Sequence, residues 1–510
     1  MPPSTSVLGR RAAAFVLPYF RPPASLTIRQ TSHRQTISHR DLTARPNRIR
    51  CCAATGAPVA TNPNPPSVKP ASGVDGRPNI IDVLESRGLF DASTSDPDAL
   101  RELCAKPVGV YSGFDPTADS LHLGNLLAIL ALAWFQRCGH RVYALVGGAT
   151  GKIGDPSGKS AERPAMADET IANNLAGIEA NLRQVLDRSA REMKAAGDDG
   201  IQEPVVVNNN DWVAPMSFLD FLRDVGKYAR VNTMMNKDSV KTRLASEEGM
   251  SFTEFTYQLL QAYDFMHLSD KHDVSFQLGG SDQWGNITAG TELTRKLKSR
   301  IVHGVTFPLL TTSDGKKFGK SEKGAVWLTP DKLSPYEFYQ FLVRTPDDDV
   351  IPFLKRLTFM PLDEIDRIAE EMQRPDYTQN SAQKRLAEEV TRMVHGEKGV
   401  VSALAATAAA APGSKAVLSV EALEAISADM PSATMTRADV VGGGILDLMV
   451  QSGLQKSKGE ARRLIKGGGA YLNNGKITTE KLSISEEDLV GGKLILLAAG
   501  KKNKLVVRVE

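Results

Sequence analysis

The chain contains 510 residues, of which 41% are hydrophobic and 24% are charged, and its formal net charge is +3. This length exceeds what one compact core supports, so we expect several domains, and no apolar run is long enough to span a bilayer. The four cysteines (Cys51, Cys52, Cys104 and Cys138) form neither a CxxC pair nor a zinc-ligand spacing, which indicates a reducing compartment and no structural metal.

The first 70 residues differ in composition from the rest of the chain. They contain nine Arg and one Lys but a single acidic residue, Asp41, together with many Ser and Thr. This composition is typical of an organelle transit peptide, and residues 49–54 resemble a plastid-type processing site followed by a disordered, proline-rich linker. We therefore expect a protein of the chloroplast and/or mitochondrion; the alternative is a basic arm that binds RNA.

The rest of the chain is acidic. Without the ten basic residues and one acidic residue of this N-terminal segment, the net charge is near −6. Any binding of RNA by the remaining chain must therefore come from local basic patches.

Residues 79–330 alternate between strand-like and helical patterns. Short apolar runs at 107–111, 142–146, 205–207 and 274–278 predict buried strands, and the stretches at 170–186, 218–227 and 252–268 predict helices. This alternation predicts an α/β domain with a Rossmann-like, doubly wound parallel sheet, in which ligands bind at the carboxyl ends of the strands. The polar motifs of this region all follow such strands.

The segment 111–125 connects one predicted strand to the next helix. Asp119 and Ser120 are good N-cap residues, which would place His122 in the first turn of that helix. Unpaired N–H groups and the helix dipole make a helix N-terminus an anion site. His122 would add a donor there, and Gly124 would allow a ligand close to the backbone. The alternative is that His122 makes only structural hydrogen bonds.

The helix predicted at 252–268 carries three polar side chains on one face. Tyr257, Gln261 and Asp264 stand at positions i, i+4 and i+7. A buried carboxylate such as that of Asp264 needs a partner or water. The pattern fits either a face in contact with solvent or a face that lines a ligand pocket.

A second polar motif, Lys-Phe-Gly-Lys-Ser, occupies residues 317–321 after an Asp-Gly turn. A charged run of this kind is by itself typical of solvated surface. Together with His-Leu-Gly-Asn at 122–125, however, it resembles the KMSKS and HIGH signatures of class I aminoacyl-tRNA synthetases. The glycine-rich segments 147–155 and 279–286 are similar to those of the bacterial-type tyrosyl-tRNA synthetases, and the resemblance extends from residue 80 to the C-terminus.

The resemblance implies activation of L-tyrosine by ATP, with Mg²⁺, and transfer of tyrosine to the 3′ end of tRNA(Tyr), with no permanently bound metal or organic cofactor. The positions that match the tyrosine pocket are Tyr111 and Asp264 at the phenolic hydroxyl, Tyr257, Gln261 and Asp155 at the ammonium group, and Thr150, Asn209 and Gln283 elsewhere. Those that match catalytic donors and cations are His122, Asn125, Thr117, Lys317, Lys320, Ser321, Lys159 and Arg163. Further ATP contacts match Asp115, Gly124, Gly279, Gly280 and Asp282.

One position departs from the family signature. Asn125 stands where the HIGH motif ends in His. An amide can still donate a hydrogen bond, but it never carries charge.

Three parts are expected after residue 330. Residues 331–427 have helical patterns at 336–343, 362–372 and 382–394 and correspond to an anticodon-binding-type domain; 428–440 is expected as linker. Residues 441–510 resemble an S4-like RNA-binding domain, with helices at 445–452 and 458–465 and a type I′ turn at Asn474-Gly475.

The S4-like part carries two basic clusters. Lys458, Arg462 and Lys466 share one helix face with Arg463 beside them, and Lys501, Lys502 and Lys504 form the second cluster. Basic faces are often only solvated surface, but in this module they predict contact with tRNA. The apolar cluster within 212–227 resembles the family's subunit contact, so we expect a homodimer and no membrane partner.

Three alternative classes fit the sequence less well. A P-loop NTPase is disfavoured because residues 154–160 and 315–321 each have one residue too few between the glycines of a Walker A motif. A non-catalytic RNA-binding scaffold has no use for His122, Lys320 and Asp264. A tryptophanyl enzyme shares the fold, but Tyr111, Asp264 and the S4-like part favour tyrosine.

Overall fold

The computed structural model describes residues 72–510 except 160–165, 322–323, 415–417, 428–429 and 501–502. All described residues belong to one compact unit, Val68–Glu510. The predicted transit peptide, Cys51 and Cys52 therefore lie outside the described residues, as do Arg163, Lys501, Lys502 and the side chain of Ser321.

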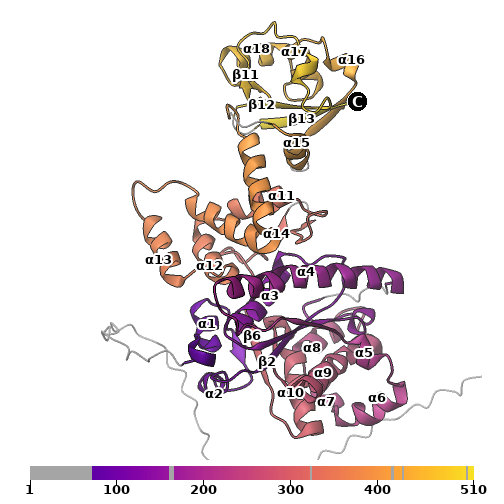
Figure 1. The fold of residues 1–510 in the computed structure, drawn as a ribbon. Helices are drawn as coiled ribbons and strands as arrows, with labels where there is room; N and C mark the ends of the chain where they lie inside the picture. The colour runs from indigo at the N-terminus through magenta and orange to yellow at the C-terminus, as the bar shows by residue number, and fades with distance from the viewer. Residues whose placement is uncertain (1–71, 160–165, 322–323, 415–417, 428–429, 501–502) are drawn as a thin grey trace, which may run out of the picture. The chain divides into compact units, whose positions relative to one another are not determined.

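Six strands form the sheet of the N-terminal half of this unit (Figure 1). In spatial order they are β1 (Ala92–Ser93), β6 (His303–Phe307), β5 (Val274–Gly280), β2 (Gly109–Phe114), β3 (Arg141–Val146) and β4 (Val205–Asn208). All neighbouring pairs are parallel except β1 with β6. The strands β2, β3 and β5 are apolar and buried because helices cover both faces. The predicted doubly wound sheet is confirmed.

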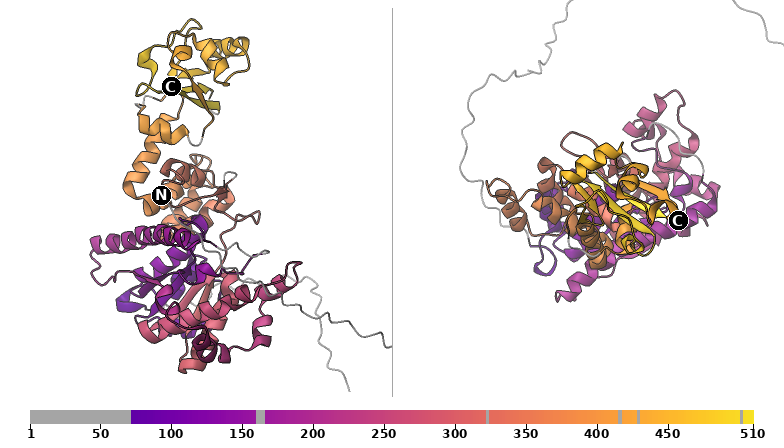
Figure 2. Two further views of the ribbon diagram at one scale, coloured as in Figure 1. Left: turned by 90° about the vertical axis from the view of Figure 1, so that its right-hand side faces the viewer. Right: turned by 90° about the horizontal axis from the view of Figure 1, so that it is seen from above.

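Helices α3 (Leu123–Arg137) and α4 (Asp168–Ala195) cover one face, and α9 (Phe252–His272) and α10 (Trp284–Lys298) cover the other (Figures 1 and 2). The shorter helices and turns are η1 (Val74–Gly76), α1 (Ile80–Ser86), α2 (Pro97–Leu103), η2 (Thr150–Lys152), α5 (Asn210–Val213), α6 (Phe218–Asp224), η3 (Gly226–Tyr228), α7 (Val231–Met235), α8 (Asp238–Leu244) and η4 (Ser281–Gln283). Since the chain places β3 and β5 on opposite sides of β2, the carboxyl ends of β2 and β5 flank the crevice where such sheets bind ligands.

Two helices differ from the sequence-based expectation. α4 continues to residue 195 rather than 186, because the small buried side chains Ser189 and Ala190 extend its packed face beyond the obvious apolar pattern. The helix predicted at 218–227 ends at Asp224, and the 3₁₀ turn η3 begins at Gly226, a residue that disfavours a continued α-helix.

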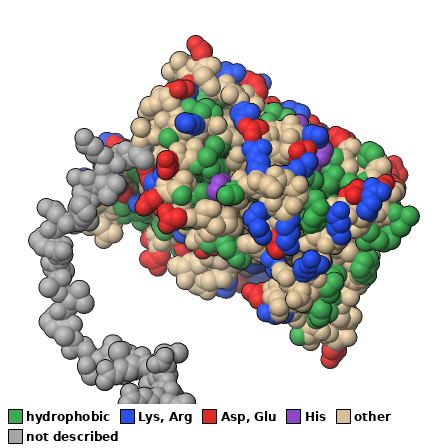
Figure 3. Space-filling view, turned by 90° about the horizontal axis from the view of Figure 1, so that it is seen from below, with side chains coloured by type: hydrophobic (Ala, Val, Ile, Leu, Met, Phe, Trp, Pro, Cys, Tyr) green, Lys and Arg blue, Asp and Glu red, His purple; other side chains and the backbone are tan. Residues whose placement is uncertain are grey.

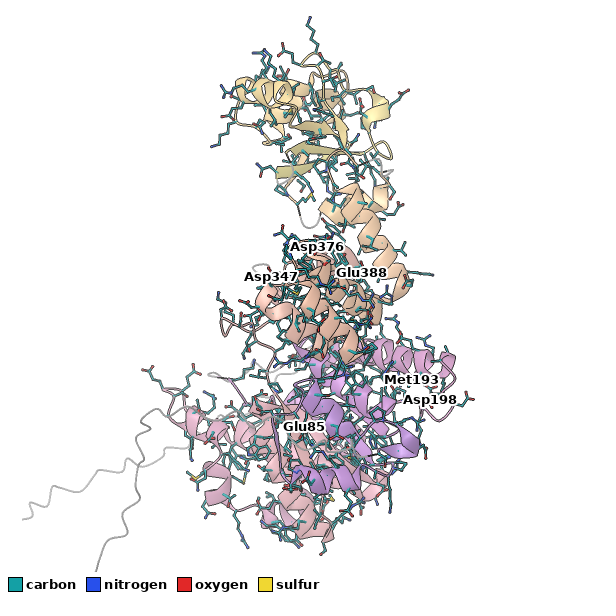
Figure 4. The ribbon with its side chains drawn as sticks, turned by 90° about the vertical axis from the view of Figure 1, so that its left-hand side faces the viewer. Glu85, Met193, Asp198, Asp347, Asp376 and Glu388 are labelled. Carbon is teal, nitrogen blue, oxygen red and sulfur yellow. The ribbon has the colours of Figure 1, made fainter. Side chains whose placement is uncertain are left out.

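A helical region follows the sheet, as predicted. It contains α11 (Pro335–Val343), α12 (Asp347–Leu357), α13 (Leu362–Glu371), α14 (Ser381–Ala409) and α15 (Val420–Ser427). Ser334 and Glu337 form a capping box at the start of α11. Asp347 of α12 accepts a hydrogen bond from Gln383 Nε2 of α14 at 2.5 Å. Asp347 and Glu388 of α14 are labelled in this helical region in Figure 4. One hydrophobic cluster extends from α3 and the sheet into α11, α12 and α14.

Before this region, the short strands β7 (Lys320–Ser321) and β8 (Gly324–Ala325) form an antiparallel hairpin. The last two residues of the motif at 317–321 therefore lie in this hairpin, and Lys317 forms an isolated β-bridge with Thr311.

The C-terminal part is built on a second sheet with its own hydrophobic core. Its strands, in spatial order, are β11 (Gly475–Lys476), β10 (Ala470–Leu472), β12 (Leu494–Ala499), β13 (Asn503–Val509) and β9 (Ser432–Met435). Its helices are α16 (Arg437–Val440), α17 (Ile445–Gln451), α18 (Lys458–Lys466) and the 3₁₀ turn η5 (Glu486–Asp488).

Two details of this sheet differ from the sequence-based expectation. The expected linker 428–440 is wrong for 432–440, because β9 pairs in parallel with β13; a four-residue edge strand is too short to leave a recognisable pattern. The type I′ turn lies one residue earlier than predicted. Leu472 pairs with Gly475, and the two central residues Asn473 and Asn474 have φ of 46° and 66°.

Candidate active site

The polar motifs meet at the crevice beyond β2 and β5. Asp115 follows β2, and Asp282 lies in the η4 turn that follows β5. Burial raises the pKa of Asp282, and the nearby carboxylate of Asp155 raises it further. Such crowding of carboxylates creates a site suited to a cationic group.

His122 is the N-cap of helix α3, whose first residue is Leu123. The side-chain oxygen of Asn125 accepts a hydrogen bond from the backbone N–H of His122 at 3.1 Å, the reciprocal half of a capping box. The prediction that Asp119 or Ser120 caps this helix, with His122 in its first turn, is therefore wrong. The Ser120 hydroxyl instead donates to the carbonyl oxygen of the next residue at 2.8 Å.

The hairpin of β7 and β8 packs on the start of α3. The N–H of Leu123 donates to the carbonyl of Val326 at 2.8 Å, and the N–H of Val326 donates to the carbonyl of Gly319 at 3.0 Å. Gly319 has φ of +107°, and a Cβ there would lie 3.1 Å from the backbone N of Gly124. Both the left-handed conformation and the close approach favour glycine. The two signature motifs thus form one structural unit.

The imidazole of His122 lies between the helix N-terminus and two lysines. Its Nδ1 is buried and has no hydrogen-bond partner among the described residues. Burial lowers the pKa of His122, and the positive charges of Lys320 and Lys159 lower it further. These effects favour the neutral ring, which with the two ammonium groups can offer donors to an anion such as a phosphate.

At the other end of the crevice, Asp264 lies fully inside the protein, 2% exposed. Its Oδ2 accepts a hydrogen bond from Asn209 Nδ2 at 3.0 Å, and its Oδ1 accepts one from Trp212 Nε1 at 2.8 Å. Burial raises the pKa of Asp264 to about 7 although both donors oppose the shift. Burial raises the pKa of Tyr111, and the negative charge of Asp264 raises it further. The buried hydroxyl of Tyr111 has no partner among the described residues. These two groups can together bind one hydroxyl.

Asp115 links the two ends of the site. Its Oδ2 accepts from the Tyr257 hydroxyl at 2.8 Å, and its Oδ1 accepts from Thr150 Oγ1 at 2.7 Å. Thr150 Oγ1 in turn accepts from Asn209 at 3.0 Å. The family resemblance assigned Tyr257 and Asp155 to the ammonium group of the substrate. The structure adds a hydrogen bond from the Tyr257 hydroxyl to Asp115.

A second network surrounds Asp155. Gln283 Nε2 donates to Asp155 Oδ2 at 2.7 Å, and Gln261 Nε2 donates to Gln283 Oε1 at 3.3 Å. Asn286 Nδ2 lies 3.3 Å from Asp155 Oδ1. Tyr257 and Asp264 are buried and Gln261 is half-buried, so the helix face predicted from spacing is directed into the protein and not to solvent.

The other predicted residues surround the same crevice. Gly279 and Gly280 end β5, Gly124 is the second residue of α3, and Lys317 is close enough to Asp282 to lower the pKa of that carboxyl against the effect of burial. The backbone N–H of Thr117 donates to the carbonyl of Asp115 at 2.8 Å. Arg163 and the side chain of Ser321 lie outside the described residues.

Two comparisons decide the family. A family model described as tRNA synthetases class I (W and Y) matches residues 104–410, and one described as the tyrosine–tRNA ligase SYY-like C-terminal domain matches 422–507. The tyrosine–tRNA ligase of Protochlamydia amoebophila is 55% identical over 430 residues, which cover 84% of this chain and 99% of that protein. The chain belongs to the tyrosine–tRNA ligase family.

Other relatives of this ligase are organellar. A chloroplastic/mitochondrial tyrosine–tRNA ligase of Arabidopsis thaliana is 52% identical over 440 residues, covering 85% of this chain and 84% of the relative. The crystal structure of a C-terminally truncated mitochondrial tyrosyl-tRNA synthetase of Aspergillus nidulans has 36% identity and a TM-score of 0.59, covering 64% of this chain and 93% of that one. The corresponding enzyme of Coccidioides posadasii has 34% identity and a TM-score of 0.57, covering 64% and 90%. These matches confirm the resemblance and contradict the P-loop NTPase alternative.

Four of the predicted RNA contacts of this ligase, Lys458, Arg462, Arg463 and Lys466, lie on α18 and are exposed. Lys504 of the second predicted cluster lies on β13 and is half-buried. Lys458 forms an ion pair with Asp447, and Arg462 lies 3.4 Å from Glu480. Arg463 and Lys466 have no carboxylate within 4.0 Å in the described part of the chain and are the cations most available to a polyanion.

Sequence reasoning missed three side chains of the ligase site. Trp212 donates to Asp264, and Asn286 donates to Asp155. Asn286 also donates to the hydroxyl of the third residue, Ser157. Trp212 and Asn286 each lie three residues after a predicted pocket residue, Asn209 and Gln283, so helical spacing could have indicated both.

Across residues 72–510, outside the gaps given above, no group of three or more His, Cys, Asp or Glu side chains is arranged to hold a metal ion. In the same ranges, no helix has both the length and the apolarity that crossing a membrane demands.

Proposed function

We propose that this member of the family activates L-tyrosine with ATP, releases pyrophosphate, and transfers tyrosine from the adenylate to the 3′ end of tRNA(Tyr). The observation that carries the proposal is the buried carboxylate of Asp264, held by two side-chain donors and close to the buried, unpartnered hydroxyl of Tyr111. Together these groups suit a phenolic hydroxyl.

The pocket gives a physical reason for selectivity against phenylalanine. Phenylalanine would leave Asp264 and Tyr111 without the hydroxyl partner in a dry pocket, and an unpaired buried polar group costs more than a missing methylene. Tyrosyl-tRNA synthetases are the standard example of this effect, and as a class they discriminate against phenylalanine by roughly 10⁵ without an editing step.

At the ammonium end, the carboxylates of Asp155 and Asp115 with Tyr257 and Gln261 suit a positively charged amine. In this arrangement the substrate carboxylate would point toward the start of α3. Attack of that carboxylate on the α-phosphate of ATP needs no enzyme nucleophile. It needs positioning and charge stabilisation.

The phosphate end would be formed by the α3 N-terminus, His122, Thr117 and the lysines Lys317, Lys320 and Lys159. Positive charges and donors there stabilise the charge that develops as pyrophosphate departs. Mg²⁺ would enter as part of the MgATP substrate. Gly279, Gly280 and Asp282 at the end of β5 would contact the nucleoside, and Ser321 and Arg163 complete the proposed set.

The second step requires a hold on tRNA. Without the N-terminal segment the chain is acidic, so α18, with Arg463 and Lys466 exposed, is the local basic surface that would bind the tRNA backbone. The division into a domain at 79–330, a helical domain at 331–427 and an RNA-binding domain remains part of the proposal, with the last domain beginning at β9.

We further propose that the ligase is a homodimer. The exposed hydrophobic residues concentrate on α6, α7, α8 and the start of α9: Phe218, Leu219, Leu222, Val231, Met235, Leu244 and Phe252. Figure 3 shows hydrophobic and basic side chains interspersed on the face seen from below. Exposed hydrophobic side chains gathered on consecutive helices favour a protein interface, and light scattering at micromolar concentration would detect the dimer.

Localisation to the chloroplast and/or mitochondrion is supported by the composition of residues 1–70 and by the name of the Arabidopsis relative. A fusion of residues 1–70 to a fluorescent protein, imaged in plant cells, would test this.

The deciding experiment for the activity is ATP–pyrophosphate exchange with each amino acid in turn, followed by charging of tRNA(Tyr). We expect exchange with tyrosine and not with phenylalanine or tryptophan. Comparable exchange with phenylalanine would contradict the assigned role of Asp264 and Tyr111.

A further inference from the structure

An aromatic pair lies behind the buried carboxylate of Asp264. The indole N–H of Trp212 donates to Asp264 Oδ1 at 2.8 Å. The imidazole of His267 stacks on the indole of Trp212, with ring centroids 4.5 Å apart and planes inclined by 13°. His267 lies three residues after Asp264 on α9, hence on the same side of that helix. One helix thus supplies both the carboxylate and the ring that contacts its donor.

Besides the stack on His267, Trp212 packs at the edge of the hydrophobic cluster that contains Tyr111, Leu145 and Phe265 and is only partly buried there. It belongs to α5, a helix of only four residues, which has almost no stability of its own. A cavity of about 460 Å³ borders the pair and is lined by both rings together with Asn208, Asp211 and His272. Both Trp212 and His267 are only half-buried. On the cavity side, therefore, open volume is available into which the indole could turn.

We propose that His267 is a positioning residue for tyrosine binding, because its ring holds Trp212 in the orientation that donates to Asp264. This inference rests on the proposed function. A parallel stack restricts rotation of the indole about its side-chain bonds, and offset aromatic pairs of this kind are favourable beyond their buried area. His267 touches no substrate, so its effect reaches the pocket only through Trp212.

Asp264 depends on this donor. The described structure gives its carboxylate two side-chain donors, Asn209 and Trp212. If the indole turns away, Oδ1 keeps its burial but loses its partner, and the carboxylate becomes a poorer acceptor for the substrate hydroxyl in its bound geometry. ATP binds at the other end of the crevice and should be unaffected.

The test is His267→Ala in the full-length protein, assayed by tyrosine-dependent ATP–pyrophosphate exchange. We expect the KM for tyrosine to rise about tenfold, the scale of one hydrogen bond to a charged group. The KM for ATP should stay unchanged. His267→Phe keeps a flat ring and should restore the KM for tyrosine.

The matched control is His272→Ala. His272 lines the same cavity, and its ring contacts in the described structure are tilted ones with Tyr143 and His267, at centroid distances of 5.4 Å and 6.5 Å. We expect kinetics equal to those of the unmodified protein. If His267→Ala fails to fold, His267→Leu, which keeps much of the volume but has no ring, takes its place.

A double-mutant cycle tests whether His267 acts through Trp212. Trp212→Phe removes the N–H and keeps a ring, so it should raise the KM for tyrosine by itself, and adding His267→Ala should raise it no further. Additive effects, or a KM for tyrosine unchanged in a folded His267→Ala protein, would overturn the inference. An unmodified protein that shows no tyrosine-dependent exchange would instead refute the proposed function, so the two failures are distinguishable.

Discussion

The side-chain oxygen of Asn125 accepts a hydrogen bond from the backbone N–H of His122 at 3.1 Å. The residue at which this chain departs from the HIGH signature therefore holds the start of helix α3 and the backbone that carries the His122 imidazole. A structural role of this kind needs an acceptor and no charge, which an amide supplies.

Replacement of Asn125 by Ala should destabilise the protein by about 0.5–1 kcal/mol, the scale of a helix-capping hydrogen bond, and lower the single-turnover rate of adenylate formation. Asn125→Asp keeps an acceptor at this position and should retain the stability. Urea unfolding and rapid-quench kinetics on both variants measure these effects. Equal stability of the Ala variant and the unmodified protein would show that the bond contributes nothing.

Replacement of Lys320 by Ala should lower the rate of adenylate formation on the order of 10²–10³, the scale of one electrostatic stabiliser of a transition state. Affinity for tyrosine should change little, because Lys320 lies on the hairpin beside His122 and away from Asp264. Lys316→Ala is a suitable control, since Lys316 is exposed in the same segment and pairs with Asp314 at 2.7 Å. A parallel loss of tyrosine affinity would argue against a role confined to the phosphates.

Tyrosine binding without ATP should weaken as pH falls below about 7. Burial raises the pKa of Asp264 to about 7 in the empty site, and the substrate hydroxyl donates to the ionised form. In the limit the dissociation constant rises about tenfold for each pH unit below that pKa. Equilibrium dialysis between pH 5.5 and 8.5 measures the dissociation constant of tyrosine. The Asp264→Asn variant should bind tyrosine more weakly, and its affinity should not depend on pH in this way.

The raised pKa of Asp264 gives the free energy of unfolding a pH dependence opposite to that of tyrosine binding. The folded pKa of Asp264 lies above its unfolded value of about 3.9, so between these values the native state holds a proton that the unfolded chain releases. The contribution of Asp264 to stability is therefore present at acid pH and is lost as the pH rises through about 7. Comparing the free energy of unfolding of the native protein and Asp264→Asn at pH 5.5 and 8 should reveal it as a smaller pH dependence in the variant.

Replacement of Arg463 and Lys466 by Ala should spare pyrophosphate exchange and weaken charging of tRNA(Tyr). Phosphate contacts release counterions, so the slope of log affinity against log salt should fall by about 1 for each contact removed. Charging assayed from 50 to 300 mM salt, with exchange on the same preparation, separates the two steps. Point variants suit this test better than removal of residues 441–510, because that deletion would leave β9 without its partner β13.

The polar side chains of the site could be predicted from the sequence where they belong to one helix or strand. The stripe of Tyr257, Gln261 and Asp264 follows from the period of a helix, and this face is directed into the protein, with Tyr257 and Asp264 buried. The parallel sheet also followed from local patterns, because strands buried on both faces read as short apolar runs.

What needed the tertiary structure were contacts between distant segments that compete with local preferences. Ser120 is a better intrinsic N-cap than His122, but the backbone of Leu121 and Leu123 is paired with residues 326–328, so the helix begins later. Nothing in the sequence around Gly319 indicates that it lies against Gly124, or that the indole of Trp212 binds Asp264 while His267 stacks on it. The sequence by itself determined which residues form the strands, the helices and the motifs, since those depend on neighbours along the chain. The fold alone decided which donors face which acceptors, because such pairs form only after packing has brought together residues far apart in the sequence.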